Sequence, residues 1–242
     1  MSVLRDAART LWPAAGERHG PLPPLLIALT AVTGVVDAAS YLKLGHVFVA
    51  NMTGNIVFLG FALAGASGLS SLTSLAALAS FLLGAFAGGW LIARVPDHRG
   101  RLLRDASAAQ AVLMAIALIV ALSAAEPLRT GARYALLVPL ALAMGLQNAS
   151  AQRLSVPELT STVLTRTLTG IASEAAPVGG PGAKLGRRAV AVGAMLLGAL
   201  LGATLALHVS VAAAVALAAA IVFGVALAVH VASRSDGAWT RP

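Results

Sequence analysis

Long apolar stretches constrain this chain more than any other feature of its sequence. Most of them approach the roughly 20 residues that a helix needs to cross a bilayer. Only 11% of the 242 residues are charged, whereas a soluble domain carries about 25%. This amount of charge is too small to cover a water-facing surface. The sequence therefore predicts an all-α, polytopic membrane helical bundle. The apolar blocks are residues 22–44, 47–66, 72–93, 106–125, 134–152, 159–173, 188–208 and 210–232.

The second and sixth blocks are unusually polar. A helix that faces lipid would not hold so many hydrogen-bonding side chains near its middle. Each block is therefore predicted to be a re-entrant or broken segment, although the second is also long enough to cross. The second block contains the polar residues Asn51, Thr53 and Asn55, together with Gly54. The polar residues of the sixth block are Thr160, Ser161, Thr162, Thr165, Arg166, Thr167 and Thr169.

The two halves of the chain resemble each other. Three sets of matches occur in the same order and at nearly constant spacing, which chance in an Ala/Leu/Gly-rich chain does not readily produce. They predict a tail at 1–21, membrane repeats at 22–125 and 126–232, and a second tail at 233–242. The matches are Gly34, Asp37 and Ala38 with Gly145, Asn148 and Ala149; Met52–Ile56 with Leu164–Leu168; and Leu82–Ala85 and Gly88 with Leu196–Ala199 and Gly202.

Basic residues cluster in four regions: the two tails and the connections after the third and sixth blocks. The positive-inside rule places all four in the cytoplasm, which requires an even number of crossings between successive regions. Three blocks lie in each of the first two intervals, so one block in each interval does not cross. The prediction is six full crossings and two re-entrant segments that enter from opposite sides, an inverted repeat. Arg129 and Arg133 fall outside and break the rule.

Several kinds of function are excluded by what the sequence lacks. The net charge of +8 lies in short connections between apolar blocks, so nucleic acid is not an expected partner. The absence of cysteine rules out thiolate metal sites, and the five histidines show no metal-ligand spacing. Neither a phosphate loop nor a catalytic triad is present. We therefore expect no enzymatic activity, no cofactor and no metal.

Two charged residues within the blocks invite opposite interpretations. An unpaired carboxylate at the depth of Asp37 would be costly, so it either couples protons or cations to a process or caps the following segment. Arg166 either attracts an anionic group, neutralises Asp37, or extends its side chain to water from an interfacial segment. The two alternatives for Asp37 and the three for Arg166 remain open.

A substrate site is predicted near the bilayer midplane, where interrupted segments of the two repeats would meet. Gln147 and Asn148 end the fifth block with donors and acceptors, which either bind substrate or hydrogen-bond across helices. Gly54 and Gly170 would allow the backbone to bend or a ligand to approach. The predicted lining residues are Asp37, Asn51, Thr53, Gly54, Asn55, Gln147, Asn148, Thr165, Arg166 and Thr167.

Two motifs resemble signatures of the YoaK-like family of bacterial membrane proteins. Residues 36–42 with 48–55 are similar to its leading signature, and residues 144–149 to its second. The resemblance implies a bacterial inner-membrane protein of about six helices, and it implies no substrate. Where the family usually reads Thr-Gly-Thr-Leu-Thr, this chain has Arg166 in place of the glycine, which implies a narrowed site or a changed selectivity.

The function expected from these features is a small secondary transporter or exporter of a small molecule or ion. Besides this substrate, the expected partner is the lipid bilayer, and both termini are expected in the cytoplasm. The small-residue helix faces could also pair two copies of the chain in a homo-oligomer. Three alternatives remain: a channel-like pore, a membrane subunit that docks a partner without transport, and, least favoured, a membrane enzyme.

Overall fold

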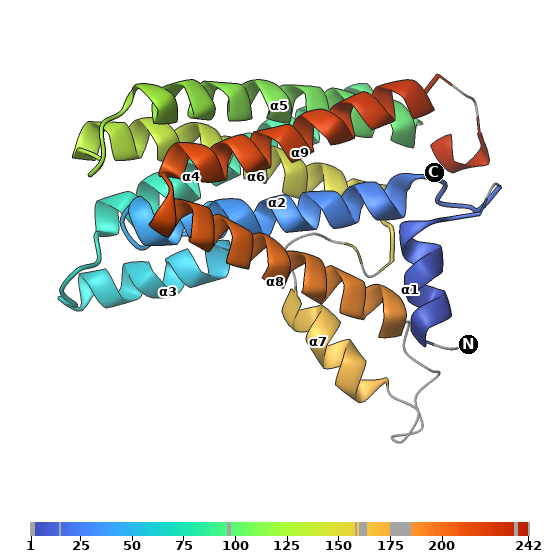
Figure 1. Ribbon diagram of the computed structural model, residues 1–242, viewed down its shortest axis with the longest axis horizontal. Helices are drawn as coiled ribbons and strands as arrows, with labels where there is room; N and C mark the ends of the chain where they lie inside the picture. Colours follow the sequence, from blue (N-terminus) through green and yellow to red (C-terminus); the bar gives the residue numbers. More distant parts are fainter. Residues whose placement is uncertain are drawn as a thin grey trace.

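The chain is described from a computed structural model that covers residues 3–14, 16–95, 98–157, 159, 164–174, 185–234 and 237–241. Nine α-helices and one short 3-10 helix form within these ranges (Figure 1). They are α1 (Val3–Leu11), α2 (Leu22–Lys43), α3 (Met52–Leu63), α4 (Ser71–Arg94), α5 (Arg99–Ser123), α6 (Thr130–Leu154), α7 (Leu164–Ser173), α8 (Leu185–His208), α9 (Val211–Ala232) and η2 (Ala238–Thr240).

Six of the helices are long and apolar enough to cross a bilayer. These are α2, α4, α5, α6, α8 and α9, each of 22 to 25 residues. The other three are shorter, and the 12 residues of α3 span only about 18 Å of a hydrocarbon core about 30 Å thick. The prediction of an all-α, polytopic helical bundle is confirmed.

Short capped turns separate several long helices. Ser70 accepts a hydrogen bond from the backbone N–H of Thr73 (3.3 Å) at the start of α4, and Ser210 accepts one from Ala213 (3.1 Å) at the start of α9. Such caps satisfy backbone donors that a helix leaves free in its first turn. They therefore fix where each helix begins after the chain reverses direction.

The long helices pack in two matching arrangements. The closest pairs are α2 with α8 and α4 with α6, and α5 contacts both α6 and α9.

Helices α2, α5 and α8 run in one direction and α4, α6 and α9 in the other, and both termini lie at the same end (Figure 1). We call this the termini end. The opposite, distal end holds the connections at 44–51, 64–70, 124–129 and 209–210.

Glycines allow the closest pairs to approach backbone to backbone. A Cβ atom at Gly84 of α4 would clash with the carbonyl of Leu142 in α6, and one at Gly198 of α8 would clash with that of Ala31 in α2. Positions 84 and 198 differ by 114 residues and positions 31 and 142 by 111, close to the spacing of the sequence repeat. The same contact is therefore made twice, once by each pair of helices.

Burial follows the same pairing of helices. The most apolar stretches of α2 and α6 are each 67% buried, those of α5 and α9 are each 39% buried, and those of α4 and α8 are each 22% buried. Large apolar side chains such as Leu82, Phe86, Leu196 and Leu200 point outward from α4 and α8. Helices α2 and α6 thus form the centre, and α4 and α8 present apolar faces suited to lipid.

The short helix α3 begins deep alongside α2 rather than at its end. After Lys43 the chain reverses through Gly45 and His46, both with positive φ (106° and 57°), and Val49 returns to the level of Asp37. Asp37 lies six residues before the end of α2, about 9 Å along the helix axis. Helix α3 then runs back toward the distal end (Figure 1).

Candidate functional site

The carboxylate of Asp37 organises the segment that returns into the bundle. One oxygen accepts the backbone N–H groups of Val49 (2.9 Å) and Ala50 (2.8 Å), and the other accepts the side-chain amide of Asn51 at 2.6 Å. The residue is buried, with 3% of its surface exposed. Its oxygens are thus occupied by donors from the chain itself, which matches the capping alternative for this residue. Arg166 is not among these partners.

Asn55 holds the same segment from the other side. Its amide oxygen accepts the backbone N–H of Phe48 (2.8 Å) and its amide nitrogen donates to the carbonyl of Phe48 (2.6 Å). The Phe48 ring stacks on Tyr41 with centroids 5.2 Å apart, and a Cβ atom at Gly54 would lie 2.8 Å from this ring. Gly54 therefore accommodates an aromatic side chain, and the neighbouring Thr53 is exposed.

Gln147 belongs to a separate polar cluster at the centre of the bundle. Its amide oxygen accepts a hydrogen bond from Gln110 of α5 (2.6 Å), and its amide nitrogen donates to the carbonyl of Leu29 (3.2 Å) and the hydroxyl of Thr33 (3.1 Å) in α2. The cluster joins α2, α5 and α6 by buried side chains. Asn148 follows Gln147 and is only half-buried.

The predicted residues of the sixth block line a cavity of about 550 Å³ beside α7. Thr165 and Arg166 are exposed there, whereas Thr167 is buried. The floor includes Arg188 of α8, which is 4% exposed and donates to Glu174 at 2.9 Å. Thr160, Ser161 and Thr162 of this block lie outside the described residues. This polar wall combines two arginines with several hydroxyl groups.

The ten predicted residues are thus distributed over three places, rather than around a single cavity. Five surround the start of α3: Asp37, Asn51, Thr53, Gly54 and Asn55. Gln147 and Asn148 lie in α6, and Thr165, Arg166 and Thr167 lie within α7. The guanidinium of Arg188 would lie 2.5–2.7 Å from a Cβ atom at Gly170. Gly170 therefore admits a side chain of the protein itself.

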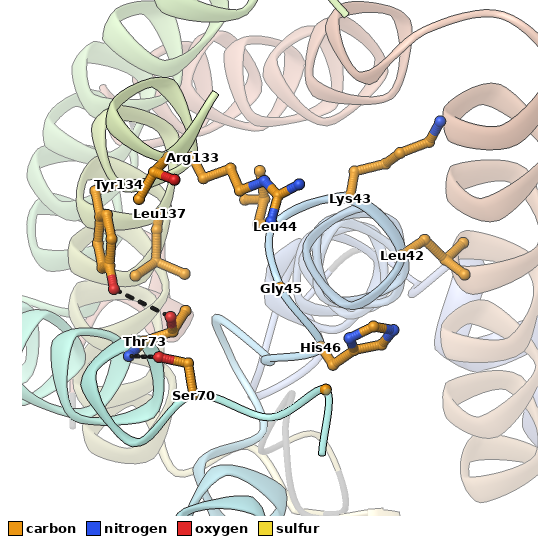
Figure 2. A pocket seen from close by; sticks show the side chains of 12 residues that line it. Leu42, Lys43, Leu44, Gly45, His46, Ser70, Thr73, Arg133, Tyr134 and Leu137 are labelled. Atoms are coloured by element: carbon orange, nitrogen blue, oxygen red, sulfur yellow. Dashed lines mark hydrogen bonds between the residues drawn. The ribbon is translucent and has the colours of Figure 1, made fainter. Parts of the chain in front are cut away.

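A further cavity opens at the distal end, about 380 Å³ in volume, where α2 ends and α4 and α6 begin (Figure 2). Lys43, His46 and Arg133 are part of its lining, with the hydroxyl groups of Thr73 and Tyr134, which are 3.1 Å apart. Neither this cavity nor the role of Gln110 was predicted from the sequence. The available signals were a glutamine within an apolar block, and a basic residue where the positive-inside rule does not expect one.

Comparison with known proteins identifies relatives but no activity. Residues 25–228 match the family model described as "Protein of unknown function (DUF1275)". The UPF0700 transmembrane protein YoaK of Bacillus subtilis (strain 168) is 33% identical over 149 residues. That alignment covers 61% of this chain and 64% of the relative, so the chain spans less than two thirds of the relative's length. No solved structure matches the chain.

Proposed function

The chain belongs to the DUF1275 family, described as proteins of unknown function, and from its architecture we propose that it is a small secondary transporter made of two inverted repeats. The observation that carries this proposal is the pairing of α2 with α8 and of α4 with α6 through equivalent glycine contacts. Inverted repeats with interrupted helices are typical of secondary transporters, in which one repeat rocks against the other.

The short helices support the same proposal. Helices α3 and α7, of 12 and 10 residues, are too short to span a bilayer. Irregular backbone at membrane depth is tolerated only where it is buried in protein or lines a cavity. The segment before α3 is held inside the bundle by Asp37 and Asn55, and α7 borders a polar cavity. On this proposal both are re-entrant segments.

The orientation follows from charge. Helix ends and connections at the termini end carry most of the basic residues, whereas Lys43, Arg129 and Arg133 lie at the distal end. By the positive-inside rule, this distribution supports an orientation with both termini in the cytoplasm of a bacterium and the bundle in its inner membrane. The distal cavity opens to the outside and the α7 cavity to the inside. Substrate would pass between them, near the glutamine cluster.

Cysteine labelling tests the orientation and the re-entrant segment together. In the naturally cysteine-free chain, single cysteines replace His46, Ser67, Thr130 and Arg101, all exposed in the structure. An impermeant thiol reagent applied from outside is expected to label the first three, and Arg101→Cys only after permeabilisation. Since His46 and Ser67 flank α3, labelling of these two from opposite sides would show that the segment crosses and would contradict the inverted repeat.

Alternating access predicts that closing one end opens the other. Cysteines replace Thr73 and Tyr134, whose hydroxyls are in contact across α4 and α6, and a short bifunctional thiol reagent joins them. A third cysteine replaces Thr169 in the lining of the α7 cavity. It is protected as a mixed disulfide during cross-linking and is then freed by mild reduction. We expect the cross-link to raise the labelling rate at Thr169 about tenfold, as a shift of about 1.4 kcal/mol between the two states would.

Two controls separate this from a general change in the protein. Cysteines at Ser70 and Thr73 lie three residues apart at the start of α4, so joining them constrains no second helix. A cysteine at Arg241, exposed near the C-terminus, reports labelling at the termini end outside the cavity. An unchanged rate at Thr169 would contradict alternating access. It would favour a pore or a partner-docking subunit instead.

A further inference from the structure

We propose that the distal cavity binds a small oxyanion, a carboxylate or a phosphate group, with Arg133 as its principal ligand. This inference rests on the proposed transport function only in naming the substrate class, because the binding itself is measured without transport. The cavity lies where both repeats contribute: α2 and α4 from the first and α6 from the second (Figure 2). A ligand there would contact both halves of the molecule.

Arg133 supplies an available guanidinium group. Its side chain extends from α6 across the cavity toward Leu44 (Figure 2), and Nε donates to the carbonyl of Leu128 at 3.1 Å. Among the described residues, its two terminal nitrogens have neither a hydrogen bond nor an ion pair. A guanidinium held at Nε presents these nitrogens as a fork that matches the two oxygens of a carboxylate or phosphate.

The other charges near the cavity leave it positive. Lys43 extends away from Arg133 (Figure 2) and lies 3.7 Å from Glu126, which also accepts the backbone N–H of Val211 at 2.7 Å. Glu126 thus offsets Lys43, and no acidic side chain among the described residues lines the cavity. Arg133 remains without a counter-charge, so an external anion would supply one.

Backbone and hydroxyl donors surround the same space. Helices α4 and α6, of 24 and 25 residues, both begin at the cavity, and helix N-termini favour anions through their free N–H groups and dipoles. No side-chain cap binds the first turn of α6. The hydroxyl groups of Thr73 and Tyr134, 3.1 Å apart, bridge the two helices. Because one donates to the other, the pair offers one further donor within the cavity.

The related helix start at the termini end already holds a carboxylate. The backbone N–H of Arg187, in the first turn of α8, donates to Asp6 of α1 at 3.0 Å. Position 187 corresponds to Thr73 of α4 at the 114-residue spacing that relates Gly84 to Gly198. The chain therefore places its own carboxylate at one of two related helix starts. At the distal end the matching N–H, that of Thr73, donates to the hydroxyl of Ser70 at 3.3 Å, and no carboxylate among the described residues lines the adjoining cavity.

The position of Arg133 also needs an explanation that orientation does not provide. In the proposed orientation Arg129 and Arg133 both lie outside the membrane, against the positive-inside bias, but only Arg133 lines the cavity. An arginine kept there at the mouth of a cavity is explained by a ligand that requires its charge. Arg166 and Arg188 need no such explanation, because the bias itself favours basic residues at the cytoplasmic end.

The test is direct binding to the purified full-length protein in a neutral detergent. Isothermal titration with inorganic phosphate and with succinate is expected to show saturable binding of at least one probe. Arg133→Gln should weaken it about tenfold or more, since a charged hydrogen-bond donor is lost. Arg129→Gln removes the same charge from the same end but from outside the cavity lining, and should leave binding unchanged. Equal binding by wild type and Arg133→Gln, or no binding to wild type, would overturn the proposal.

A second arm separates a dissolved oxyanion from a lipid headgroup. The titrations are repeated in nanodiscs of phosphatidylcholine and of phosphatidylglycerol. Unchanged phosphate or succinate binding in both membranes identifies a dissolved ligand. A lipid headgroup is identified by two results together. Phosphate and succinate binding is lost only in phosphatidylglycerol nanodiscs, and native mass spectrometry shows phosphatidylglycerol retained by wild type but not by Arg133→Gln. Oxyanion binding combined with an unchanged labelling rate at Thr169 would reject the transporter and keep the site.

Discussion

Asp37→Ala is expected to destabilise the protein by about 3 kcal/mol or more. The substitution removes the acceptor of three hydrogen bonds, from Val49, Ala50 and Asn51, and leaves these donors buried without a partner. Each unsatisfied buried donor costs about 1–3 kcal/mol. The measurement is the midpoint of unfolding in a denaturing detergent titration, followed by circular dichroism. A midpoint equal to that of wild type would show that the returning segment does not depend on this carboxylate.

Two further variants separate the role of the carboxylate from a general effect of mutation. Asp105→Ala removes a carboxylate that is one third exposed and paired with the adjacent Arg104; because exposed ion pairs contribute little, we expect a change below about 1 kcal/mol. Asn51→Asp places a second carboxylate beside Asp37 and should destabilise through repulsion. Adding Asp37→Asn to it exchanges the two groups and should recover part of the loss. A double variant that is additive would argue against a direct pair.

Gly84→Ala is expected to be the second most damaging change. The new Cβ atom would clash with the backbone carbonyl of Leu142, which cannot move as a side chain would, so α4 and α6 must separate. Overpacking of this kind costs about 1–3 kcal/mol, and the loss of close backbone approach adds to it. The same detergent titration measures the effect, together with the yield of monodisperse protein.

Gly89→Ala, in the same helix, is the matched control. Apart from the adjacent residues and backbone of α4 itself, no atom lies within 4 Å of a Cβ atom at Gly89, so alanine should be neutral or stabilise the helix by up to about 1 kcal/mol. The repeat allows a second comparison: Gly198→Ala should resemble Gly84→Ala, and Gly193→Ala, also without neighbours, should resemble the control. If Gly84→Ala and Gly89→Ala behaved alike, the close packing of α4 on α6 would be wrong.

The local arrangement around α3 was only partly predictable. Asp37 and Asn51 stood out because polar side chains are rare in apolar blocks, and capping of the next segment was one of the two interpretations of Asp37. The backbone partners of Asp37 at Val49 and Ala50 could not be predicted, since two apolar residues give no sign that their N–H groups face a carboxylate. The pattern marks a polar residue as important without identifying its partner.

The glutamine cluster and the distal cavity depend on contacts between distant segments. Gln110 meets Gln147 from 37 residues away, and Gln147 meets Thr33 from 114 away. Which faces of three helices meet depends on their rotation about their own axes, and a nearly uniform apolar block carries little periodic signal from which to infer it. Arg133 was noticed only as an exception to a charge rule, because its place beside Thr73 and Tyr134 exists only after α4 packs on α6.

Hydropathy along the chain was enough to predict the membrane class and the six long helices, because the cost of burying charge and unpaired backbone in lipid is a local property of each segment. The repeat was predicted in the same way, from glycines matched at a nearly regular spacing in the sequence. The pairing of α2 with α8 and of α4 with α6 is apparent only in the folded protein. So are the hydrogen bonds from a returning backbone to Asp37 and the position of Arg133 in the lining of a cavity. These depend on how closely glycine lets helices approach and on how each helix is turned, which hydropathy does not encode.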